Sequence, residues 1–183
     1  MRLFIGISPT EEIRKGLVEA QESLQHHGVT GTYLSPENLH MTLAFIGEYP
    51  DVDPVLNAME TVFFSPFEIC YTHLGTFRKS IVWGGIEESA SLSSLVKQLR
   101  CELARAAIPF DNSTFSPHLT LVRHADFIKG IPPVEINPIS MTVEKISLYR
   151  SDRSGSGMIY TEIGSVEAAP KRANNTESPA AAG

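Results

Sequence analysis

Two copies of one short motif stand out in this sequence as residues that could do chemistry. The first copy is His40-Met41-Thr42-Leu43, and the second is His118-Leu119-Thr120-Leu121. Side chains at positions i and i+2 of a β-strand point to the same face. Each copy therefore predicts a histidine and a threonine together on a polar face, with apolar residues on the opposite face. One His-x-Thr arises often by chance, so the repetition carries the information.

Two facing histidines can divide general acid–base catalysis between them. Imidazole has an unperturbed pKa of ~6.5, so one ring can be neutral while the other is protonated. Threonine hydroxyls can donate hydrogen bonds to an anion held between the rings. This set suits attack on a phosphodiester. Structural histidines are the plain alternative. A zinc site is disfavoured because no carboxylate cluster or cysteine pair accompanies the histidines, and we expect no metal or cofactor.

Two further residues stand five positions after the histidines. Arg123 follows the second motif and is a candidate phosphate ligand, since a guanidinium matches phosphate oxygens, and an exposed surface arginine is the alternative. Strict alternation would turn Arg123 away from His118, so a twist, a bulge or the end of the strand would be needed to bring it back. Phe45 holds the matching place in the first motif. It is a candidate for stacking on a base, and packing in the core is an equal alternative.

The remaining pattern predicts elements that place these motifs on strands. Apolar runs favour strands over residues 2–8, 39–46, 67–74, 80–86, 115–123, 139–149 and 157–163. Apolar residues at helical spacing favour helices over about 10–27, 53–62 and 91–107. This order predicts an α+β fold with helices packed on antiparallel sheets, built as two similar halves.

Length and composition bound the class of protein. The 183 residues correspond to about one domain. The net charge of −6 argues against a large basic surface for nucleic acid. No apolar run approaches the ~20 residues of a membrane span, and Cys70 and Cys101 are too few for a disulfide scaffold. We expect one folded domain over residues 1–164 and a disordered tail over 165–183, which lacks aromatic residues.

The motifs and their surroundings resemble a known family. Residues 38–48 (NLHMTLAFIGE), 115–123 (FSPHLTLVR), the opening 2–7 (RLFIGI) and 147–151 (SLYRS) are similar to the two-histidine phosphoesterase superfamily, in its branch of bacterial RNA 2′,3′-cyclic phosphodiesterases, also called 2′-5′ RNA ligases. The resemblance spans roughly residues 1–164. It implies a bilobal α+β fold with pseudo-twofold symmetry, in which each lobe brings one motif to a central cleft.

The resemblance also implies a reaction and its participants. The substrate would be RNA or a nucleotide with a 2′,3′-cyclic phosphate, hydrolysed without metal to a 2′-phosphate. His40 would be the proton donor and His118 the proton acceptor, while Thr42 and Thr120 would hold the phosphate. We expect a cytoplasmic monomer that does not bind membranes.

Three alternatives remain open at this point. The same site could join RNA through a 2′-5′ linkage, with a ribose hydroxyl in place of water. It could act on small cyclic nucleotides. A non-catalytic nucleotide- or RNA-binding module could use the same cleft, although binding alone does not need two titrating histidines.

Overall fold

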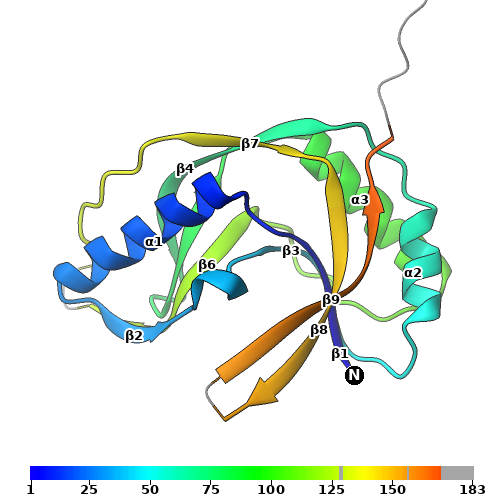
Figure 1. Ribbon diagram of the computed structural model, residues 1–183, viewed down its shortest axis with the longest axis horizontal. Coiled ribbons are helices and arrows are strands. Elements are labelled where there is room, and N and C mark those ends of the chain that lie inside the picture. Colours follow the sequence, from blue (N-terminus) through cyan, green and yellow to red (C-terminus); the bar gives the residue numbers. More distant parts are fainter. Residues whose placement is uncertain (128–129, 156, 170–183) are drawn as a thin grey trace, which may run out of the picture.

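The computed structural model describes residues 1–127, 130–155 and 157–169, which form one strongly curled antiparallel sheet with helices packed on it (Figure 1). The strands run in the order β7-β4-β5-β6-β3-β1-β8-β9, and β2 lies beside β6. The strands are β1 (Arg2–Ile7), β2 (Thr30–Tyr33), β3 (Met41–Glu48), β4 (Phe67–Phe77), β5 (Ile81–Ile86), β6 (His118–Asp126), β7 (Ile139–Val143), β8 (Lys145–Ser154) and β9 (Gly157–Glu167). The helices are α1 (Glu11–His26), α2 (Asp53–Glu60) and α3 (Ala90–Arg105), with a 3₁₀ turn η1 (Pro36–Asn38).

The sheet consists of two halves that meet at the two motifs. Strands β3 and β6 are paired through Met41 and Leu119, and each of these residues directly follows a motif histidine. One half contains β3, β1, β8 and β9, and the other contains β6, β5, β4 and β7. The predicted α+β class with antiparallel strands is therefore confirmed, and the halves form one continuous sheet.

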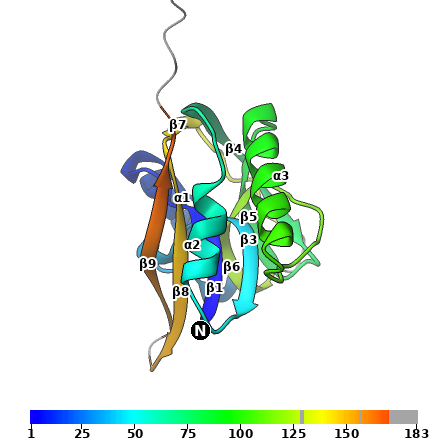
Figure 2. The same ribbon diagram turned by 90° about the vertical axis from the view of Figure 1, so that its right-hand side faces the viewer.

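The two long helices begin at side-chain caps and bury apolar stripes. The Thr10 hydroxyl accepts a hydrogen bond from the Ile13 N–H at the start of α1, and the Ser89 hydroxyl accepts one from the Leu92 N–H at the start of α3. Helix α1 lies against β6 and β7, whereas α3 lies against β3, β4 and α2, and Figures 1 and 2 show these helices on the two sides of the sheet. Each helix thus packs on the strand of the motif that is further from it along the sequence: α1 on β6 and α3 on β3.

The strand boundaries differ from the expected ones in three places. Strand β2 was not predicted, because its four residues include none that is fully buried. The expected strand 139–149 is two strands, β7 and β8, and β8 continues to Ser154. Strand β9 runs to Glu167, and the N–H groups of Ala168 and Ala169 donate to the carbonyls of Glu144 and Phe64. The start of the expected tail is therefore part of the sheet, and residues 170–183 lie outside the described residues.

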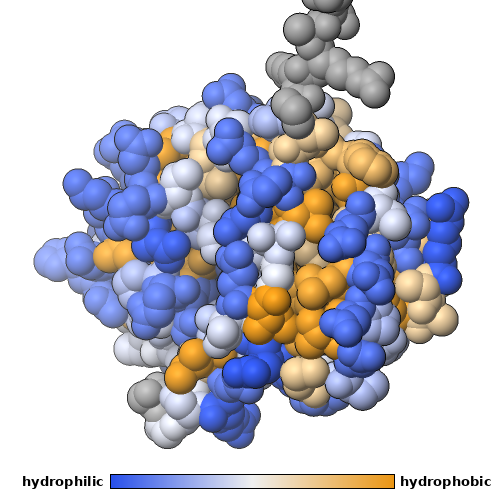
Figure 3. Space-filling model, turned by 45° about the vertical axis from the view of Figure 1, so that its right-hand side comes forward, coloured by the Kyte–Doolittle hydropathy of each residue, from blue (hydrophilic) through white to orange (hydrophobic). Residues whose placement is uncertain are grey.

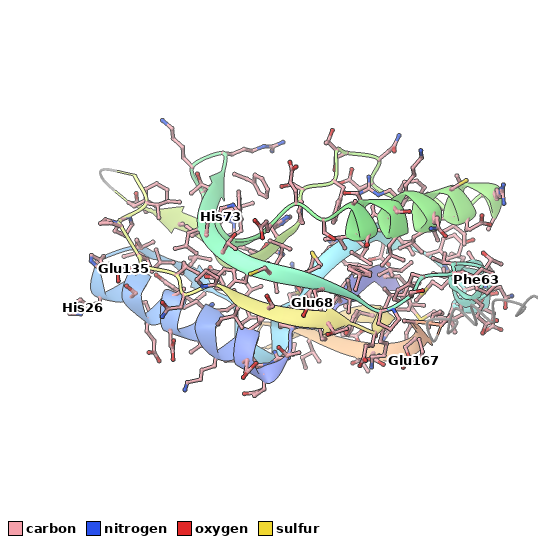
Figure 4. All side chains as sticks on the ribbon, turned by 90° about the horizontal axis from the view of Figure 1, so that it is seen from above. His26, Phe63, Glu68, His73, Glu135 and Glu167 are labelled. Atoms are coloured by element: carbon pink, nitrogen blue, oxygen red, sulfur yellow. The ribbon has the colours of Figure 1, made fainter. Side chains whose placement is uncertain are left out.

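The outer surface is mostly polar. Figure 3 shows polar side chains over most of one face, with apolar ones gathered near its centre. In Figure 4, His26 at the end of α1 and the exposed Phe63 after α2 lie at opposite ends of the molecule. Both cysteines are free. No helix in the described part of the chain is long and apolar enough to cross a membrane.

Candidate active site

The two histidines are held in the same way at the centre of the sheet. His40 directly precedes β3, and His118 opens β6. The Nδ1 atom of His40 is 2.7 Å from the carbonyl oxygen of Asn38, and Nδ1 of His118 is 2.7 Å from that of Ser116. A carbonyl oxygen only accepts, so Nδ1 carries the hydrogen in both rings. Each Nε2 is thereby left to exchange a proton with a ligand.

Both rings line one cleft of about 910 Å³. All six residues that the sequence singled out contribute to its lining, which includes His40, Thr42, Phe45, His118, Thr120 and Arg123. The two halves of the sheet supply three of these residues each, from β3 with the residue before it and from β6. The cleft therefore brings together motifs that are far apart in the chain.

A β-bulge in β6 explains how Arg123 reaches the cleft. Val122 is paired with Val82, but the next pair joins Thr120 to Trp83, so Leu121 is an extra residue in the ladder. Leu121 and Val122 are both fully buried. An extra residue shifts the alternation by one position, and Arg123 consequently returns to the face of Thr120.

Strand β3 contains a bulge at the same offset from its histidine. Ala44 is paired with Ile5, and Thr42 with Gly6, so Leu43 is the extra residue. Leu43 and Ala44 are buried in succession, and the half-buried Phe45 then lines the cleft with Thr42. The structure therefore places Phe45 at the cleft wall, where its ring lies 5.0 Å from the guanidinium carbon of Arg2.

A helix side chain bonds to the carbonyl of each bulged leucine. The buried Gln21 of α1 donates from Nε2 to the carbonyl of Leu121 at 2.9 Å and to that of Leu34 at 2.8 Å. Arg100 of α3 donates from Nε to the carbonyl of Leu43 at 3.4 Å. Buried polar groups without a partner are costly, so these bonds stabilise the bulged backbone. Gln21 and Arg100 were not identified from the sequence, since nothing near either motif indicates them.

Aromatic rings surround each histidine. Phe4 and Tyr160 lie 4.5 and 5.0 Å from the His40 ring, centroid to centroid. Phe77 and Trp83 lie 4.8 and 6.0 Å from the His118 ring. Phe4, Phe77 and Tyr160 were missed because their strands give no sign of which face meets the cleft. Trp83 contacts His118 from beside the cleft.

The environment lowers the pKa of both histidines. Burial is the main cause for each, and it outweighs the hydrogen bond to the carbonyl, which favours the charged form. The positive charge of Arg123 lowers both values further. The pKa of His40 falls to about 4, in part because His118 is close. Both rings are therefore biased to the neutral form before an anion binds.

The donor set of the cleft does not suggest a metal centre. Within residues 1–127, 130–155 and 157–169, no group of three or more histidine, cysteine, aspartate or glutamate side chains could hold an ion. The two acidic side chains that line the cleft, Glu48 and Asp152, are near cations. Glu48 lies 3.5 Å from the N-terminal amine, and Asp152 lies 2.7 Å from Nε of Arg150.

A duplicated His-x-Thr motif on a curled antiparallel sheet is typical of the two-histidine phosphoesterase class. The family model described as "2'-5' RNA ligase superfamily" matches residues 9–155, and the chain belongs to this family. The chain is 31% identical over 173 residues to the RNA 2′,3′-cyclic phosphodiesterase of Thermotoga maritima, covering 87% of this chain and 91% of that protein.

Solved structures show the same similarity. The apo form of Escherichia coli LigT matches with a TM-score of 0.79 at 28% identity, covering 91% of this chain and 96% of LigT. LigT complexed with 3′-AMP matches with a TM-score of 0.78 at 27% identity over the same shares of the two chains. The fold of this chain is thus the fold of LigT.

Proposed function

We propose that this chain hydrolyses terminal 2′,3′-cyclic phosphates of RNA to 2′-phosphomonoesters, with His40 and His118 as the acid and the base. One observation carries the proposal. Two imidazoles, each with Nδ1 bonded to a carbonyl, line one cleft from matching positions of the two halves. The names of the relatives agree with this substrate, since the Thermotoga maritima and Escherichia coli proteins are both called RNA 2′,3′-cyclic phosphodiesterase.

The proposed step uses the two free Nε2 atoms. Neutral His118 accepts a proton from water through Nε2 while the water oxygen forms a bond to phosphorus. The bond between phosphorus and O3′ breaks, and Nε2 of protonated His40 gives its proton to O3′. The products are a 2′-phosphate and a free 3′-hydroxyl. If the 5′-hydroxyl of a second RNA end attacks phosphorus in place of water, the same break of the bond between phosphorus and O3′ would give a 2′-5′ linkage at this site.

The neighbouring residues fit the charge that this step develops. Thr42 and Thr120 lie two residues beyond the histidines on the cleft face and would donate to the nonbridging oxygens. Arg123 would neutralise the phosphate. An anion between the rings stabilises the imidazolium form, so the substrate itself raises the pKa of His40 toward the value that a proton donor needs. Phe45 would stack on the base of the terminal nucleotide.

The test is turnover of an oligonucleotide that ends in a 2′,3′-cyclic phosphate, measured in EDTA with product analysis. The wild type should convert the cyclic phosphate into a terminal 2′-phosphate at the same rate with and without EDTA. His40→Ala and His118→Ala should each remove nearly all turnover, and the double variant should be little worse because the two groups act as a unit.

His27→Ala is the matched control, because His27 is an exposed histidine at the end of α1. This variant should retain wild-type turnover. Substantial activity in His118→Ala, inhibition by EDTA, or a 3′-phosphate product would contradict the proposal. Binding of the oligonucleotide without any product would instead support a non-catalytic module.

A further inference from the structure

The cleft concentrates unpaired positive charge in a chain whose net charge is −6. Three arginines line it, Arg2, Arg123 and Arg153. Within the described residues, none of these guanidinium groups has an ion pair or a hydrogen bond. The acidic residues of the cleft already have cationic neighbours, as described above. The cleft therefore offers more anion-binding groups than a single phosphate between the histidines would use.

The strand register separates Arg153 from His40. On the cleft side, Phe4 is paired with Tyr149, and both rings lie near His40. Two residues further along β8, Ser151 is paired with Arg2 on one side and with Tyr160 on the other.

Arg153 comes two residues later again, paired with Met158 of β9. At ~3.3 Å per residue, Arg153 stands roughly 13 Å along β8 from Tyr149. A phosphate held between the histidines is too small to span this separation.

From this arrangement we propose that Arg153, with Tyr160 beside it, forms a subsite for the phosphodiester on the 5′ side of the terminal nucleotide. The inference rests on the proposed function and narrows its substrate class to oligonucleotide ends. Arg153 binds the phosphodiester that joins the last two nucleotides, and the Tyr160 ring, 5.0 Å from His40, packs against the terminal nucleotide between the two anion sites. A cyclic mononucleotide has no such phosphodiester and leaves Arg153 unused.

The β8–β9 hairpin that carries this subsite is attached to the first motif. The Asn38 side chain donates from Nδ2 to the carbonyl of Met158 at 2.7 Å, while the Asn38 carbonyl accepts from His40. Figure 1 shows this hairpin projecting from the body of the sheet. The bond through Asn38 fixes the hairpin relative to the catalytic ring, so the subsite and the histidines keep a constant spacing.

The experiment compares kcat/KM for two substrates, a cyclic mononucleotide and a tetranucleotide with the same terminal nucleoside 2′,3′-cyclic phosphate. The wild type should favour the tetranucleotide. Arg153→Ala should lower the ratio of the two kcat/KM values by about tenfold or more, the effect of one charged hydrogen bond. Arg153→Lys should recover part of the ratio. The salt dependence of log kcat/KM for the tetranucleotide should weaken by ~0.7 in slope, as expected for one lost phosphate contact on a single strand.

Arg105→Ala is the matched control, since Arg105 is an exposed arginine at the end of α3, paired with Glu102. It removes the same charge and should leave the ratio unchanged. Equal losses on both substrates, no loss on either, or no wild-type preference for the tetranucleotide would overturn the subsite. If the wild type turned over neither substrate, the proposed function would fail. The subsite would still be decided by titrating the tetranucleotide that ends in a 2′-phosphate, which Arg153→Ala must bind more weakly.

Discussion

The hydrogen bonds of Gln21 give a test of how the bulge in β6 positions Arg123. Gln21→Leu replaces the polar side chain with an apolar one of similar size in α1 and removes both donated hydrogen bonds. The carbonyl of Leu34 then loses its side-chain donor, while that of Leu121 retains the N–H of Leu34 at 2.9 Å. An unsatisfied buried carbonyl costs ~1–3 kcal/mol, and a lost second bond ~0.5–1.5 kcal/mol.

The sum predicts that Gln21→Leu lowers the free energy of unfolding by about 2–4 kcal/mol. For a chain of this size the melting temperature should fall by roughly 5–15 °C. Gln21→Glu should cost more, because a carboxylate would face two carbonyl oxygens. Gln25→Leu is the matched control, since Gln25 is exposed on the same helix, and its effect should stay within about 0.5 kcal/mol.

The same variant should weaken substrate binding, because a relaxed bulge turns Arg123 away from the cleft. Well below the melting temperature, Gln21→Leu should raise KM several-fold in the cyclic phosphodiesterase assay. In an Arg123→Gln background the KM effect of Gln21→Leu should vanish, since both changes remove the same contact. A loss of stability with no change in KM, or additive KM effects in the double variant, would refute the positioning role.

Two further perturbations address the histidines and threonines. Arg123→Gln removes a charge that lowers the pKa of both His40 and His118, so both limbs of the pH profile of kcat/KM should move to higher pH. The control Arg105→Gln should leave both limbs in place. A shift to lower pH in Arg123→Gln would contradict the electrostatic assignment. Thr42→Val and Thr120→Val keep the side-chain shape but remove the hydroxyl. Each should lower kcat by a factor on the order of 10²–10³, as for the loss of an oxyanion donor, with little change in melting temperature. A wild-type kcat in these variants would show that the threonines are only structural.

The sequence predicted the main strands and helices because their apolar periods are strong. The apolar spacing over residues 91–107 identified α3, and the alternation around each motif placed both histidines on strands, within 39–46 and 115–123. Strand β2 was missed because it lies largely exposed beside β6 and gives no apolar period. The boundary near Ser165 was set by composition, whereas pairing with β8 extends β9 to Glu167.

The site was predicted less completely than the strands that hold it. Repetition identified the histidines and threonines, and matching offsets identified Arg123 and Phe45. Strict alternation gave the wrong face for Arg123, since the extra residue at Leu121 depends on tertiary hydrogen bonds and leaves no local pattern. Arg153 and Tyr160 were not recognised, because only the register of β8 with β1 and β9 shows which face meets the cleft.

Each half of the sheet depends on a helix from the other part of the chain to position its side of the cleft. Gln21 belongs to α1, which precedes the first motif, yet it bonds to Leu121 beside the second. Arg100 belongs to α3, which precedes the second motif, yet it bonds to Leu43 beside the first. Each bulge directs one side chain into the cleft, Phe45 from β3 and Arg123 from β6. Each is stabilised by the helix that precedes the other motif. The spacing of the two histidines and the orientation of the residues around them therefore depend on the same contacts that join the halves.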